Sequence, residues 1–162
     1  MARLTIGIVI GLILSFISVS LFDQWETLKT AIVLGQYNIF QGFSILAEAN
    51  FEFNIIGFFI SGPYSLAGFF QPAFLSSLFL GFFTGIIVKG IKRGFISSTL
   101  VIIITLLMWI MFAIFSGQDL MSFFTGPQLV ETIGGILGAL LAGISGGVLG
   151  GFLGGSYEEK VY

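Results

Sequence analysis

The 162-residue chain has no cysteine, no histidine and little charge. Without cysteine and histidine it lacks disulfides, thiolate nucleophiles, histidine general bases and the usual ligands of zinc, haem and iron–sulfur clusters. Only 9% of its residues are charged, against roughly 25% in soluble domains. Because 56% of the residues are hydrophobic and the mean hydropathy is +1.08, the composition predicts an integral membrane protein.

The few charges that remain also exclude several functions. The formal net charge is −2 with no extended basic face, which argues against nucleic acid as a partner. No charged residue lies deep inside an apolar segment, although such residues usually mark proton and ion pathways in membranes. The serines and threonines have no base to activate them. We therefore expect a protein that is not an enzyme and has no catalytic residue, cofactor or metal site.

Glycine is abundant instead, and it is concentrated in residues 131–155, where two neighbouring rows at a spacing of four contain only Gly and Ala. The first row is Gly135, Ala139, Gly143, Gly147, Gly151 and Gly155, and the second is Gly134, Gly138, Ala142, Gly146, Gly150 and Gly154. In lipid the backbone must satisfy its own hydrogen bonds, so a helix persists despite these glycines. Rows of small residues let another backbone approach closely, so both rows predict a helix-packing interface.

Four apolar segments are long enough to cross a ~30 Å hydrocarbon core. They are residues 4–22, 72–90, 95–115 and 131–155. The first two carry shorter small-residue rows, which include Gly7 and Gly11, and Ser77, Gly81 and Gly85. The third has no such row, so we expect spans one, two and four to pack closely with span three at the periphery. The first segment also resembles a secretory signal peptide, so its removal is the alternative to a retained helix.

Residues 23–71 contain no clean apolar run of spanning length. They begin with the pattern of a short amphipathic helix, with Trp25 at the level of the lipid headgroups. Farther on, alternation of apolar and polar residues at 51–55 suggests a strand. We favour an irregular, partly amphipathic outer cap, and a re-entrant loop around Gly62 and Pro63 is the alternative. The expected fold is thus a single all-α membrane domain, residues 1–162, with four transmembrane helices.

The charges favour one orientation in the cell membrane. With four spans, the basic residues on one side are Arg3, Lys89, Lys92, Arg93 and Lys160. The positive-inside rule therefore places both termini in the cytoplasm. The acidic residues gather on the outer side, where Glu131 and Glu52 could line a vestibule. The alternatives are a solvated acidic rim and, for Glu131, a carboxylate favoured near a helix N-terminus.

Two patterns resemble a known family. A basic glycine turn, KGIKRG at residues 89–94, precedes a bulky span and a last helix of repeated Gly-Gly pairs. Over residues 72–155 this arrangement resembles a family of small glycine-rich archaeal membrane proteins of unknown function. The resemblance implies four spans and an archaeal plasma membrane, and it implies no activity or site residue.

These features favour an interaction role, because packing surface is abundant and reactive groups are scarce. The leading hypothesis is a non-catalytic accessory subunit of a larger membrane complex, or a self-associating scaffold, packed through its Gly-rich helix faces. Its partners would be membrane lipid and other membrane subunits or a second copy. The alternative is a small channel or carrier with an acidic outer mouth.

Overall fold

The computed structural model describes residues 2–62 and 64–155, and within these ranges the chain is all-helical, without strands. Pro63 and Lys160, which entered the sequence reasoning, lie outside the described residues. The strand suggested at residues 51–55 is wrong. A 3₁₀ turn, η1 (Ala49–Phe51), ends this stretch of helix, and the alternation arises because Phe51 and Phe53 turn inward while Glu52 faces out.

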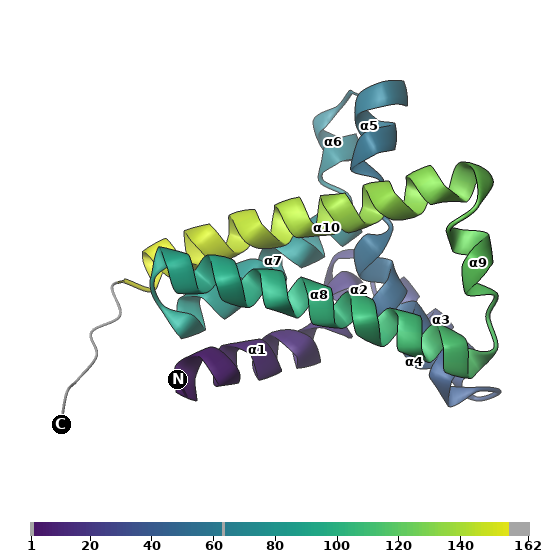
Figure 1. Ribbon diagram of the computed structural model, residues 1–162, viewed down its shortest axis with the longest axis horizontal. Coiled ribbons are helices and arrows are strands. Elements are labelled where there is room, and N and C mark those ends of the chain that lie inside the picture. The colour runs from purple at the N-terminus through teal and green to yellow at the C-terminus, as the bar shows by residue number, and fades with distance from the viewer. Residues whose placement is uncertain (1, 63, 156–162) are drawn as a thin grey trace.

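Two long helices, α8 (Ile91–Ser116) and α10 (Gly126–Leu153), run antiparallel along the whole molecule (Figure 1). Both are long and apolar enough to span a membrane. The tight turn before α8 uses Lys89 and Gly90 at positive φ, and Pro127 occupies the first turn of α10, where its missing N–H costs nothing. A short helix, α9 (Leu120–Phe123), lies between the two.

The first two expected spans are shorter helices. Helix α1 (Ala2–Ser15) ends at a turn before α2 (Ser18–Phe22), and α7 (Pro72–Val88) has 17 residues. Within the described residues, two helices are of spanning length, or three if a bent pair is counted as one broken span. The packing of the helices does not distinguish the two sides of a membrane. The cytoplasmic placement of the end that carries the basic residues therefore stays a prediction.

The outer segment is more regular than expected, because most of it is helical. Its helices are α3 (Glu26–Gly35), α4 (Ile39–Glu48), α5 (Ile55–Ser61) and α6 (Leu66–Phe69). Helix α3 lies where the sequence predicts a short amphipathic helix, but it begins after Trp25, and Ala31 is its only buried residue. Helices α3 and α4 pack together, and α4 also packs along α8. The bent pair that could form a third span is residues 39–51 with α5, and its halves differ in direction by 46°.

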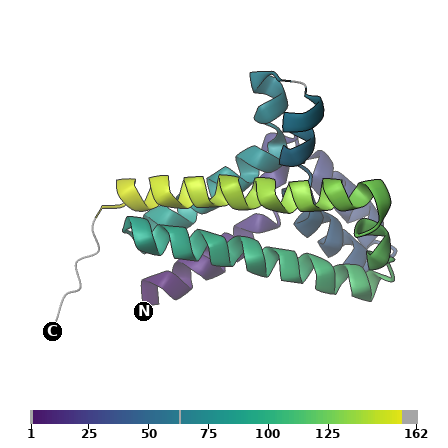
Figure 2. The same cartoon turned by 45° about the horizontal axis from the view of Figure 1, so that its top comes forward.

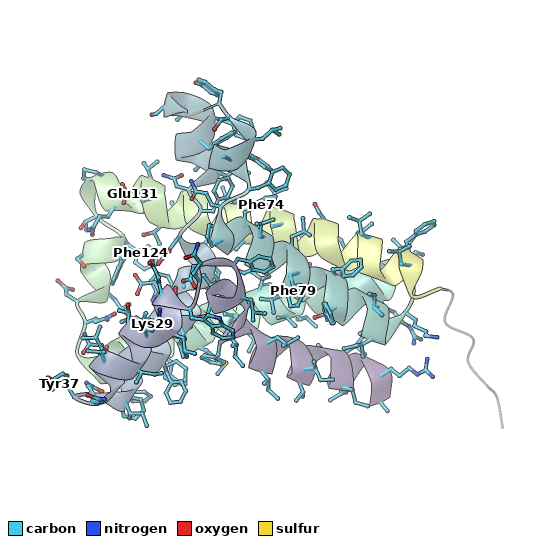
Figure 3. All side chains as sticks on the ribbon, turned by 180° about the vertical axis from the view of Figure 1, so that it is seen from behind. Lys29, Tyr37, Phe74, Phe79, Phe124 and Glu131 are labelled. Carbon is cyan, nitrogen blue, oxygen red and sulfur yellow. The ribbon has the colours of Figure 1, made fainter. Side chains whose placement is uncertain are left out.

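Helices α5 and α6 leave the bundle and project from its side (Figures 1 and 2). We call residues 55–69 the side arm. Its base is a cluster of phenylalanine rings in which Phe53 lies 5.3 Å from Phe74 and Phe69 lies 4.6 Å from Phe74. Figure 3 shows Phe74 where the arm meets the bundle. These ring contacts hold the base of the arm against the bundle, and α5 also packs against α10.

The glycine rows of α10 form the centre of the bundle. Every buried residue of α10 belongs to one of the two rows. A Cβ atom on Gly147 would lie 2.6 Å from the Gly94 carbonyl oxygen, and one on Gly151 would lie 2.6 Å from the Gly90 carbonyl oxygen. The Gly90 N–H donates a 3.0 Å hydrogen bond to the Gly151 carbonyl, so the backbones themselves are in contact.

The rows meet different neighbours at their two ends. Residues 143–151 face α7 and α8, whereas Gly134, Gly135 and Gly138 face the chain around η1 and the start of α5. A row at a spacing of four winds around a helix of 3.6 residues per turn, which explains the change of neighbour. Both rows are thus occupied by this chain's own helices.

The expectation that span three is peripheral is wrong. Helix α8 packs against α10, α7, α4 and α1. Its inward side has no glycine row, but the buried side chains near its start are small. They are Ser97, Ser98 and Val101. Serine and threonine, like glycine, are common small residues at helix interfaces in membranes. Their hydroxyls can hydrogen-bond to the backbone of their own helix. The Ser97 hydroxyl does so, donating to the Gly94 carbonyl at 3.2 Å.

Substitution of the stripe tests this packing. We expect Gly147→Leu to lower the melting temperature in detergent by about 10 °C, because overpacking typically costs 1–3 kcal/mol and here the obstacle is backbone. The matched control, Leu141→Ala, changes a side chain that is 53% exposed and should shift the melting temperature by only a few degrees. Equal losses from both substitutions would show that the stripe is not the core interface.

Candidate functional site

A buried asparagine joins the broken helices at the middle of the bundle. Asn50, in η1, is 1% exposed. Its Nδ2 donates to the carbonyls of Ser15 (2.9 Å) and Ala47 (3.2 Å), and its Oδ1 accepts from the hydroxyls of Ser18 (3.2 Å) and Ser76 (3.3 Å). One side chain thereby connects α1, α2, α4 and α7.

This position matters because Ser15 and Ala47 lie at or near helix ends. The last carbonyls of a helix have no partner within it, and an unpaired polar group in lipid costs several kcal/mol. Asn50 supplies donors to both carbonyls. The chain can therefore break α1 and end α4 inside an apolar bundle.

The residues that flank Asn50 line an acidic pocket of about 300 Å³. The pocket lies between the end of α4, α8, α9 and the start of α10. Its lining residues are Glu48, Phe51, Glu52, Trp109, Phe123, Gln128, Glu131 and Thr132. Figure 3 shows Glu131 near the end of the molecule that carries α9. Asn50 and η1 hold Glu48 and Glu52 in place, and the second turn of α10 supplies Glu131.

The carboxylates of this pocket are crowded by other acidic groups. Burial, and to a smaller extent the negative charge of Asp23, raise the pKa of Glu52 above its ordinary value. Asp23 borders a second acidic pocket of about 330 Å³ that shares Glu52. Deprotonated carboxylates in this arrangement repel one another, so a cation that enters either pocket is attracted.

Aromatic rings form the inner wall of the first pocket, which we call the acidic pocket. The Trp109 ring stacks on Phe51 at 5.8 Å and meets Phe123 edge-on at 5.5 Å. Trp109 is 2% exposed, and its indole N–H lies close to the Glu48 carboxylate. The pocket therefore combines three carboxylates with an apolar floor.

Among the residues that the structure describes, no group of three acidic side chains is arranged to hold one metal ion. Glu131 lines the pocket together with Glu48 and Glu52. Asp119 caps α9, where its carboxylate accepts from the Met121 N–H at 3.0 Å.

The vestibule residues expected from the sequence, Glu131 and Glu52, thus lie in one pocket. Sequence reasoning missed Asn50, Trp109 and Phe51. A single asparagine in a polar stretch and a single tryptophan in a bulky span gave no periodic signal. The closeness of Glu48 to Trp109 depends on tertiary packing, so it has no signal in the sequence.

The expected packing residues lie mostly inside the bundle. Gly7 and Gly11 of α1 face α7, and Gly11 also meets Val101 of α8. Gly81 and Gly85 of α7 face α10, and the buried Ser77 hydroxyl donates to the Asn50 carbonyl at 3.5 Å. The α10 residues that are buried are Gly134, Gly135, Gly138, Ala139, Ala142, Gly143, Gly146, Gly147, Gly150 and Gly151. Gly155 follows the end of the helix and is exposed.

Comparison of the chain with protein-family models, curated proteins and solved structures finds no match. Its activity and partners therefore have to be argued from the geometry of the chain itself.

The asparagine junction gives a direct test. We expect Asn50→Leu to lower the melting temperature in detergent by about 5–15 °C, because it removes the hydrogen bonds of Asn50 with two carbonyls and two hydroxyls, and a buried group left without a partner costs about 1–3 kcal/mol. Gln41→Leu on α4 is the control, since the same change there removes an amide that makes no hydrogen bond and should shift the melting temperature little. An Asn50→Leu protein as stable as wild type would show that the junction is dispensable.

Proposed function

We propose that this chain is a non-catalytic integral membrane protein that acts as a subunit of a larger membrane assembly. The side arm carries the proposal. Its exposed fractions are 64% for Phe59, 72% for Ile60, 72% for Tyr64 and 80% for Leu66. Exposure of such an apolar projection to water is unfavourable, so we expect lipid or protein to cover it.

The arm is built to keep its shape away from the bundle. Asn54 caps the start of α5 by accepting from the Gly57 N–H at 2.8 Å, and Ser65 caps α6 by accepting from the Gly68 N–H at 3.1 Å. The Tyr64 hydroxyl lies 3.2 Å from the Ile60 carbonyl oxygen at the end of α5, where it can donate. Capped ends suit a surrounding with little water, because water is then not needed as a partner.

The partner that we propose for the arm is a different membrane protein. Self-association through the glycine rows of α10 has lost its support, because those rows are filled by α7, α8 and η1. The bulky face of α10, with Leu149 and Phe152 exposed, already provides ordinary lipid contact. The arm adds apolar surface beyond what anchoring in lipid requires.

Association can be measured by native mass spectrometry after mild extraction. We expect the wild-type chain to leave the membrane with a heavier partner, and the double substitution Ile60→Ser with Leu66→Ser to reduce that complex at least fivefold, since both anchors lose their apolar contacts. Leu149→Ser, on the lipid-facing side of α10, should leave the complex intact.

Two results would contradict the proposal. A wild-type monomer accompanied only by lipid would make the arm a membrane anchor. A complex of identical chains would make the partner a second copy.

A second candidate, a small cation channel or carrier, is favoured by the acidic pocket. Glu52 and Glu131 lie at an exposed border of this pocket, where they would concentrate cations. Such attraction is screened over about 8 Å at physiological ionic strength, so transport that depends on it falls as salt rises.

Liposomes containing the purified chain and a cation-sensitive dye separate the two candidates. We expect no flux above that of empty liposomes for wild type, Glu131→Gln or Glu52→Gln. A cation-selective flux in wild type that falls with either substitution and with added salt would favour the channel or carrier.

A further inference from the structure

We propose that a basic pocket at one end of the bundle binds the phosphate group of an anionic lipid. This pocket, which we call the basic pocket, has a volume of about 520 Å³. It lies between the turn that joins α7 to α8 and the end of α10. The inference goes beyond the subunit role and does not rest on it, because the pocket and the side arm are at different places along the bundle (Figure 1).

The charge of the basic pocket selects an anion. Three of the chain's six lysine and arginine residues line it, namely Lys89, Lys92 and Arg93, and no acidic side chain of the described residues does. Helix α1 begins at the same end of the bundle and places Arg3 there as well (Figures 1 and 2). Basic pockets between membrane helices bind the phosphate-bearing headgroups of lipids.

The start of α8 adds to this positive charge. Helix α8 begins after Gly90 without a side-chain cap, and its first turn contains no acidic residue. The first N–H groups of a helix have no partner within it, and the helix dipole makes this end partly positive. Lys92 and Arg93 therefore lie where the dipole disfavours cations. A phosphate in the pocket compensates these charges and accepts hydrogen bonds from backbone N–H groups.

The turn that carries the lysines is held against α10. The Gly90 N–H donates to the Gly151 carbonyl at 3.0 Å, and a Cβ atom on Gly151 would lie 2.6 Å from the Gly90 carbonyl oxygen. Lys89, the residue before this contact, has a φ of 57°, which residues other than glycine rarely adopt. The backbone of the pocket is thus formed before any ligand binds, and a preformed site loses less entropy on binding.

The apolar side of the pocket selects a lipid over a free phosphate ion. Ile91 and Phe152 also line the pocket, and they are 49% and 67% exposed. They lie at the ends of α8 and α10, which are helices of spanning length, where the hydrocarbon core gives way to headgroups. A lipid whose phosphate lies among the lysines covers these side chains with its acyl chains, whereas free phosphate leaves them exposed.

Binding can be measured on the full chain after exchange into a neutral detergent that removes bound lipid. We expect phosphatidylglycerol to raise the melting temperature saturably, because a ligand that binds the folded state stabilises it. Phosphatidylcholine with the same acyl chains, whose headgroup has no net charge, should raise it far less. Added salt should weaken the effect of phosphatidylglycerol, since the attraction between these charges is screened.

Substitutions assign the effect to the pocket. Lys89→Gln and Lys92→Gln should each weaken the apparent affinity for phosphatidylglycerol by about fivefold, which is the typical contribution of one basic residue near an anionic lipid surface. Lys29→Gln is the matched control, because this lysine is an exposed residue of α3 outside the pocket. It should leave the affinity unchanged.

Any of four results would overturn the proposal. The first is an equal rise in melting temperature with phosphatidylglycerol and phosphatidylcholine. The second is an unchanged affinity in the combined Lys89→Gln and Lys92→Gln protein. The third is an equal loss in the Lys29→Gln control, which would show a general attraction between charges. The fourth is an equal rise with inorganic phosphate at the same concentration, which would make the pocket a site for free phosphate.

Discussion

Close contact between backbones is the constraint on which this bundle depends. Between apolar helices in lipid there is little hydrophobic force to gain, so helices associate by packing and by polar contacts. Helix α10 meets this condition by presenting only glycine and alanine inward, so that the carbonyls around Gly90 and Gly94 come within reach of its own backbone. Larger residues here would separate α10 from both α7 and α8. The short helices could then not keep their present positions in the bundle.

The second requirement is that broken helices keep their polar groups satisfied. Two helices end near the middle of the bundle, α1 at Ser15 and α4 at Glu48. Asn50 serves both ends, and its burial among serine hydroxyls is affordable because all of its polar atoms are paired. The same turn then delivers Glu48 and Glu52 to the acidic pocket. A structural junction and a candidate binding site are therefore parts of one short segment.

Much of this fold could be predicted from the sequence, and the rest could not, for identifiable reasons. The spans of α8 and α10 and the inward role of the glycine rows follow from long apolar runs and strict spacing. The break after Ser15 gives no such signal, because apolar residues continue through Phe22. The strand predicted at residues 51–55 is wrong because a tight helical turn and a strand can both place alternate residues inward. The pocket was seen only in part, since Trp109 joins Glu52 and Glu131 through contacts between distant segments.

The segment around η1 contacts both the arm and the pocket. Substitutions that test either one should therefore be made at residues away from this segment. Asn54 caps α5 and lies against Gly134 of α10, while Glu52, two residues earlier, borders the pocket. A change at Asn50 or Asn54 would disturb the junction, the arm and the pocket together, and its effect could not be assigned to one of them. Ile60 and Leu66 lie at the tip of the arm, and Glu131 and Phe123 lie on the far wall of the pocket. Substitutions at Ile60, Leu66 and Glu131 leave the shared turn intact, so a change in association and a change in cation flux can be separated.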